Sequence, residues 1–100
     1  MINKLEKQKE ITNMYALSNW AESTKGLYRY AIGVNFCYEI IILTHCLDTD
    51  ILTAEANVYA VETWRDKTNS SVFERELLLE KHPVSECIQI AIRDFSDNCK

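Results

Sequence analysis

The chain has 100 residues, 47% of them hydrophobic and 26% charged, which is the composition of one globular domain and excludes a disordered or fibrous chain. Its net charge of −4 and pI near 5.1 disfavour binding to nucleic-acid phosphates, which draws on clustered Lys and Arg. The longest apolar run, Ile40–Leu43, is far shorter than the roughly 20 residues of a membrane span, and Met1–Lys7 lacks the apolar core of a secretory signal. We therefore expect a single cytoplasmic domain over residues 1–100, with neither a membrane nor nucleic acid as a direct partner.

The N-terminal region, residues 3–23, predicts one amphipathic helix. It has good helix formers, no Gly or Pro, and apolar residues at helical spacing, among them Ile11, Met14 and Trp20. Gly26 follows in a polar segment and suits the left-handed position after a helix end. We therefore expect this helix to end near Ser23.

Aromatic and β-branched residues predict strands in the next part of the chain. Residues 27–34 contain Gly33 as their only break, and their pattern fits a short strand, a connector or a continuation of the helix. Residues 35–45 are apolar at both parities, which is typical of a strand central in a sheet or covered on two sides. We expect a strand there and leave the three alternatives open for 27–34.

A turn over Cys46–Asp50 and two further strands complete the predicted sheet. Residues 52–64 alternate, with a face of small side chains against which a helix can pack closely. The polar segment 65–71 predicts a hairpin loop, and residues 72–81 predict the last strand. The small-residue face consists of Ala54, Ala56, Val58 and Ala60.

His82–Pro83 ends that strand, and Pro83 suits the first position of a helix that runs to about Asp97. The apolar stripe of this helix follows the helical period and predicts a core-facing side. It consists of Val84, Cys87, Ile88, Ala91, Ile92 and Phe95. The predicted fold is α+β, in two layers, with a three- to four-stranded antiparallel sheet and an N-terminal and a C-terminal helix on one face.

The four cysteines give little support to catalysis or metal binding. Cys37, Cys46 and Cys87 fall among apolar neighbours and are expected to be packed thiols, whereas Cys99 lies beside a chain end. His45 precedes Cys46, but neighbours on a strand point to opposite faces, and no CxxC or HExxH spacing occurs. We expect no metal and no cofactor.

A small Cys/His enzyme or ligand-binding domain is retained as an alternative, with Cys37 or Cys46 as nucleophile beside His45 or His82. Nothing in the spacing brings these groups together. The carboxylates of Glu74 and Glu76 fit a solvated strand face better than an acid and base pair.

The order of a helix, three strands and a helix resembles that of the double-stranded-RNA-binding domain. That family has a lysine cluster at the start of its last helix. This chain has Pro83-Val84-Ser85-Glu86-Cys87 there, with an acid and no base. The resemblance is therefore one of element order, and it implies no RNA binding.

Acidic residues gather in the middle of the chain, because no Lys or Arg occurs from Ala31 to Trp64. On the sheet face opposite the helices, we expect carboxylates around a few apolar side chains, forming a docking surface for a basic partner. The predicted partner-binding residues are Glu55, Asn57, Tyr59, Val61, Glu74, Glu76, Leu78 and Glu80, with Thr63 on the same face.

The leading functional hypothesis is a small non-catalytic protein-binding module, in one form an inhibitor that docks on a basic, nucleic-acid-handling protein. In size and charge the chain resembles the small acidic proteins of phages and mobile elements, including anti-CRISPR inhibitors. The alternative to the binding module and to the Cys/His enzyme is a homodimer of unknown role, in which residues 36–43 bury their second apolar face.

Overall fold

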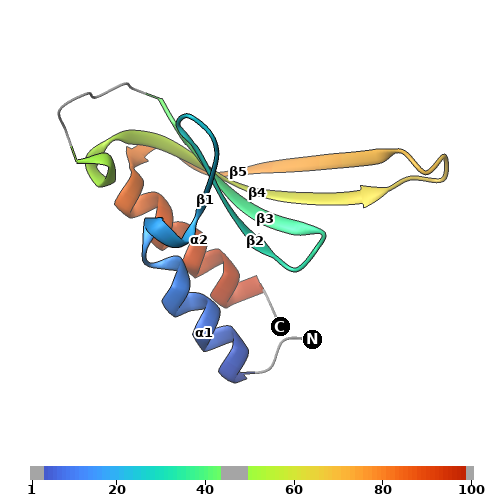
Figure 1. Ribbon diagram of the computed structural model, residues 1–100, viewed down its shortest axis with the longest axis horizontal. Helices are drawn as coiled ribbons and strands as arrows, with labels where there is room; N and C mark the ends of the chain where they lie inside the picture. The colour runs from blue at the N-terminus through green and yellow to red at the C-terminus, as the bar shows by residue number, and fades with distance from the viewer. Residues whose placement is uncertain (1–3, 44–49, 99–100) are drawn as a thin grey trace.

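A computed structural model describes residues 4–43 and 50–98 as a five-stranded antiparallel sheet with two helices (Figure 1). The strands lie in chain order, β1-β2-β3-β4-β5. Helix α2 packs against β3, β4 and β5, and α1 packs against α2, so both helices lie on one side of the sheet. The elements are α1 (Lys4–Met14), η1 (Leu17–Asn19), β1 (Ala21–Thr24), β2 (Leu27–Ile32), β3 (Phe36–Ile42), η2 (Ile51–Thr53), β4 (Glu55–Arg65), β5 (Ser71–Pro83) and α2 (Val84–Asn98).

The α+β class and the antiparallel sheet are confirmed, but the expected three to four strands are too few. The open stretch after Gly26 is strand β2, which pairs along its whole length with β3. Strand β1 lies inside the region predicted as helix. The predicted turn over residues 46–50 falls mostly outside the described residues.

The first helix is shorter than predicted because downstream side chains satisfy its end. Helix α1 stops at Met14, where the Trp20 indole N–H donates to the Met14 carbonyl over 3.0 Å. The Asn19 side chain donates in the same way to the Asn13 carbonyl. These two bonds replace the helical partners that terminal carbonyls lack, and they turn the chain into β1. Gly26, with φ +83°, then serves the β1–β2 turn instead of a helix end.

The core lies between the sheet and α2, as the apolar stripes predict. The small face of β4 and the stripe of α2 are buried, and they meet the inward side chains of β3, Tyr38 and Ile40. The Tyr38 hydroxyl donates to Asp94 of α2 over 2.7 Å, so the buried ring keeps a polar partner. Burial of each large apolar side chain contributes about 1.5–3 kcal/mol.

Two irregularities in β5 change which side its residues face. Tyr59 lies opposite Leu77 and Val58 opposite Leu79, which leaves Leu78 as an extra residue. Closer to the end of the strand, the Lys81 amide donates over 2.9 Å to the side-chain oxygen of Asn57. Lys81 itself has φ +58°. The residues of β5 before Leu78 therefore pair with β4 in a different register from the residues after it.

Strands β4 and β5 continue beyond the rest of the sheet as a two-stranded arm (Figure 1). The Thr63 amide donates to the Asn35 carbonyl over 2.9 Å where the β2–β3 hairpin ends. At the tip of the arm, the Asp66 carboxylate accepts from the amides of Thr68 and Ser70 and from the Thr68 hydroxyl. The arm is thus ordered by its ladder and its turn, without helices over it.

Candidate functional site

The structure divides the predicted docking residues between the two sides of the sheet. Glu55, Asn57, Tyr59 and Val61 lie on the open face, away from the helices, because they alternate with the buried alanine face of β4. Glu74 and Glu76 lie on the helix side instead, opposite Glu62 and Ala60. Leu78 lies in the bulge and packs against the core, and Glu80 is exposed beyond it.

The expectation of one acidic outer face is therefore wrong, and the register explains it. The prediction assumed that side chains alternate along the whole of β5 without a bulge. The bulge at Leu78 means that Arg75, not Glu74 or Glu76, shares the open face with Tyr59 and Val61.

Three predicted residues on the open face have structural roles. Val61 is only 2% exposed, so its side chain is unavailable to a partner. Asn57 accepts from the Lys81 amide and donates to the Tyr59 hydroxyl, which holds the second irregularity of β5 in place. The guanidinium of Arg75 lies over the Tyr59 ring at 5.9 Å from its centroid.

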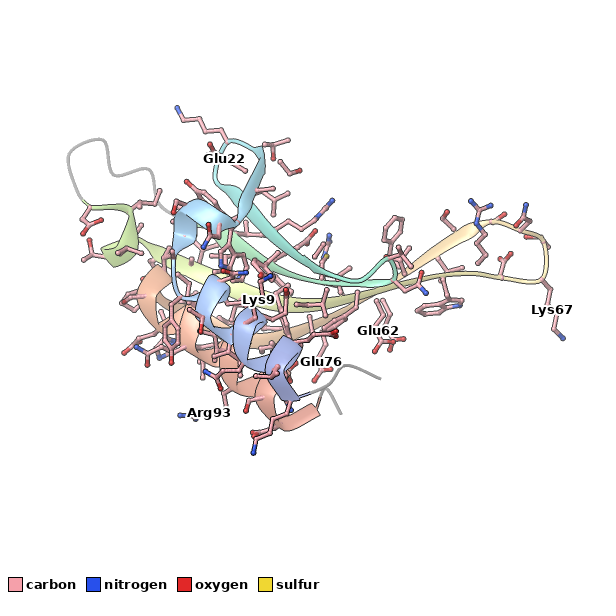
Figure 2. All side chains as sticks on the ribbon, turned by 60° about the horizontal axis from the view of Figure 1, so that its bottom comes forward. Lys9, Glu22, Glu62, Lys67, Glu76 and Arg93 are labelled. Carbon is pink, nitrogen blue, oxygen red and sulfur yellow. The ribbon has the colours of Figure 1, made fainter. Side chains whose placement is uncertain are left out.

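The acidic residues gather in a groove on the helix side, at the base of the arm. The groove has a volume of about 860 Å³ and is formed where β3, β4 and β5 pass beyond the end of α2. Figure 2 shows Glu62 and Glu76 on this side of the sheet. The groove walls combine carboxylates and aromatic rings, namely Glu62, Glu76, Asp94, Phe36, Tyr38 and Trp64.

Two acidic side chains at this groove lie opposite each other on β4 and β5. Glu62, in the groove wall, and Glu74, beside the groove on β5, are direct cross-strand partners, and no described cation forms an ion pair with either. Like charges directly opposite on antiparallel strands destabilise the pairing. Asp94 accepts a hydrogen bond from the Tyr38 hydroxyl and adds a further carboxylate to the walls. Trp64 is 41% exposed at the outer end.

Sequence reasoning missed Glu62, Trp64 and Asp94 as members of this site. Glu62 and Trp64 continue the parity of Ala60, so the helix-side face of β4 could have been followed past the last alanine. Asp94 lies on the flank of the apolar stripe of α2, and no pattern in the sequence indicated that this helix ends beside β4.

The open face carries a second cluster, in which two arginines share one buried carboxylate. Glu39 of β3 is 1% exposed. Arg29 of β2 donates to its Oε2 from Nε (3.1 Å) and Nη2 (2.7 Å), and these bonds raise the pKa of Arg29. Arg75 of β5 lies with Nη2 at 2.9 Å from Oε1. The side chains of Arg29 and Arg75 are 45% and 51% exposed.

Of the two cysteines considered as nucleophiles, only Cys37 lies in the described part of the chain, and its setting and that of the packed Cys87 disfavour a thiolate. Burial, reinforced by Glu39, raises the pKa of the Cys37 thiol, although Arg29 and Arg75 oppose the shift. Burial and Glu86 raise the pKa of Cys87 to about 11. A raised pKa reduces the nucleophilic thiolate at neutral pH. His45, Cys46 and Cys99 lie outside the described residues.

Within residues 4–43 and 50–98, no group of three or more His, Cys, Asp or Glu side chains is arranged to hold a metal ion. None of the described helices is long and apolar enough to cross a membrane. Comparisons with protein-family models, curated proteins and solved structures find no match to this chain.

Proposed function

We propose that this protein is a non-catalytic protein-binding module that binds a basic segment of another protein in the acidic groove. The observation that carries this proposal is the pair Glu62 and Glu74, held opposite each other without a counter-ion among the described residues. The pair weakens the arm in the free protein. A Lys or Arg side chain between the two carboxylates turns that repulsion into two attractions.

The groove also offers apolar contact area, which a charged rim alone lacks. Trp64, Phe36 and Tyr38 give it aromatic walls, and the Trp64 ring stands at the open end. Arginine stacks on aromatic faces and forms bidentate bonds with carboxylates, so it suits this groove better than lysine. The proposed partner is a protein with an exposed arginine-rich surface, and a nucleic-acid-handling protein that this module inhibits is one such partner.

The direct test is calorimetric titration with an arginine-rich peptide and with a glutamate-rich peptide of equal length. The arginine peptide should bind with an affinity that falls as salt is raised, and the glutamate peptide should not bind. Replacing Glu62, Glu74 and Glu76 together by Gln should weaken binding about tenfold or more, since each rim charge contributes about 0.5–1 kcal/mol.

The matched control replaces Glu55, Glu80 and Glu86 by Gln, which removes the same number of exposed carboxylates elsewhere. This variant should bind with almost unchanged affinity. Equal losses in the two variants would mean that binding follows net charge and would refute the groove as the site. Affinity capture from host lysate at low and high salt then identifies the natural partner.

Self-association through the arm is a second candidate, because Trp64 and Phe73 expose aromatic rings on opposite faces of it. Light scattering decides between the candidates. A dimer mass at micromolar concentration that a Phe73→Ser, Trp64→Ser variant abolishes supports this candidate, and a monomer mass at all concentrations removes it.

A further inference from the structure

Strand β5 forms the last strand of the sheet, and over the arm no other described element lies along its outer edge (Figure 1). From Ser71 to Leu77 the strand is regular, because its bulge lies beyond Leu77. An edge strand leaves every second backbone N–H and C=O without a ladder partner. This stretch can therefore accept one more strand.

Along this edge, acidic side chains on the helix side of the sheet alternate with a basic side chain on the open side. Glu74 and Glu76 face the helix side and border the acidic groove, whereas Phe73, Arg75 and Leu77 face the open side. Phe73 is 68% and Leu77 44% exposed, so two apolar side chains flank the arginine. The alternate side chains of a strand added here would contact two different surfaces, the acidic helix side and the open side with its arginine and apolar residues.

Arg75 retains donors for such a strand. Its Nη2 forms an ion pair with Glu39 Oε1 at 2.9 Å, and the other N–H groups of this half-exposed guanidinium remain for a partner. Glu39 is also held by the two bonds from Arg29 to its other oxygen. The open face thus has two guanidinium groups and one carboxylate. Arg75 makes one contact with Glu39, whereas Arg29 makes two hydrogen bonds.

The same charges oppose pairing of the edge with itself. When two copies pair antiparallel in a continuous sheet, residues of the same face meet. A register centred on Arg75 puts Arg75 against its own copy and Glu74 against Glu76, and one centred on Glu74 or Glu76 pairs like carboxylates. Such like-charge contacts are how edge strands avoid self-association. A register centred on Phe73 avoids these contacts but sets Glu74 against Val72 and Arg75 against Ser71, so the charges gain no partner. A different chain with complementary charges is therefore the favoured occupant.

We propose that the partner segment binds in extended form as a sixth strand along Ser71–Leu77, with basic residues opposite Glu74 and Glu76 and an acidic residue opposite Arg75. Apolar residues then meet Phe73 and Leu77, giving the recognised pattern apolar, basic, acidic, basic, apolar. Main-chain bonds to the edge supply affinity and the alternate side chains supply specificity. This inference rests on the proposed function, because the basic residues are those that the groove attracts.

The test uses blocked peptides with the core sequence Val-Arg-Asp-Arg-Val in polar flanks, titrated into the full chain. A peptide of the same composition with its core scrambled should bind about fivefold weaker or worse, because a mismatched charge pattern forfeits at least about 1 kcal/mol. A peptide methylated on alternate backbone nitrogens should lose binding at least about tenfold, because it cannot form the ladder. Methylation of the other nitrogens serves as its control.

A charge exchange tests the register. In a Glu74→Lys, Glu76→Lys variant, binding of the original peptide should be lost, and a peptide with Glu in place of both Arg should restore it. Amide exchange should show new protection in 71–77 when the original peptide is bound to the unaltered chain.

The outcomes separate this inference from the proposed function. If scrambled and methylated peptides bind as well as the original, the groove binds basic segments in no fixed conformation, and strand addition is refuted while the proposed function stands. If neither these peptides nor an arginine-rich peptide binds at millimolar concentration, both proposals fail.

Discussion

Under the helices, β4 presents Ala56, Val58 and Ala60 to α2, and all three are buried. Farther along the same strand, Trp64 is 41% exposed, and on β5 Phe73 is 68% exposed. The covered part of the sheet and the arm thus have the same ladder but very different amounts of apolar contact. A two-stranded ribbon without a packed face is marginally stable by itself. The arm is therefore maintained by the covered sheet and is available for contacts outside the chain.

The largest effect is expected from two phenylalanines that differ in their surroundings. Phe95 of α2 is fully buried, so Phe95→Ala should lower the free energy of unfolding by about 3–5 kcal/mol through lost burial and a cavity. Phe73→Ala on the arm should change it by less than about 0.5 kcal/mol. Urea unfolding measures both. Comparable losses in the two variants would contradict the division between covered sheet and arm.

Loss of Arg29 should have the next largest effect. Arg29→Gln removes two hydrogen bonds from the buried Glu39 carboxylate and leaves it with Arg75, so the free energy of unfolding should fall by about 1–3 kcal/mol. Neutralising both groups in an Arg29→Gln, Glu39→Gln variant should recover part of this loss in the same urea assay. A double variant less stable than Arg29→Gln alone would show that the open face does not depend on pairing this charge.

The buried thiol of Cys87 makes the covered region sensitive to alkaline pH. Burial raises its pKa to about 11 in the fold, so the protonated form is favoured there. The resulting stability is complete below the pKa of the unfolded thiol and is lost as the pH rises toward 11. Stability should therefore fall between pH 9 and about 11, and less steeply in Cys87→Ala. Parallel pH profiles for the two proteins would refute this contribution.

The smallest global effect is expected at the tip of the arm. Asp66 is exposed, and its carboxylate accepts hydrogen bonds from the Thr68 hydroxyl and from the amides of Ser70 and Thr68, which lower its pKa. Asp66→Ala should speed amide exchange in residues 62–74 and leave exchange in α2 unchanged. Faster exchange throughout the chain would mean that the arm and the covered sheet unfold as one unit.

Sequence patterns predicted the covered region well because packing and periodicity agree there. The alternation of β4 and the stripe of α2 both record contact with the same core, and both are buried as expected. The end of α1 could not be predicted from the sequence. It depends on hydrogen bonds from the side chains of Trp20 and Asn19 to the carbonyls of Met14 and Asn13, and these contacts follow no periodicity. Strand β1 was assigned to the helix for the same reason.

The candidate site was predicted less well because it depends on register. One extra residue at Leu78 moves Glu74 and Glu76 to the helix side and brings Arg75 to the open face. No Gly or Pro marks this bulge in the sequence. Both carboxylates were recognised as candidates, but their neighbours were wrong, and with them the face on which a partner would dock.

The strand order also sets the sequence of events as the chain is synthesised. Every neighbour in the sheet is a neighbour in the chain, so each strand can pair with the one made just before it. Among the described elements, helix α2 emerges after all five strands, and until then the inner face of β3 and β4 has no cover from it. We expect Tyr38, Ile40 and Val58 to lack that cover in the interval, which makes the nascent sheet more prone to aggregate. Docking of α2 is therefore the step that covers the apolar face of a sheet whose strands are already paired.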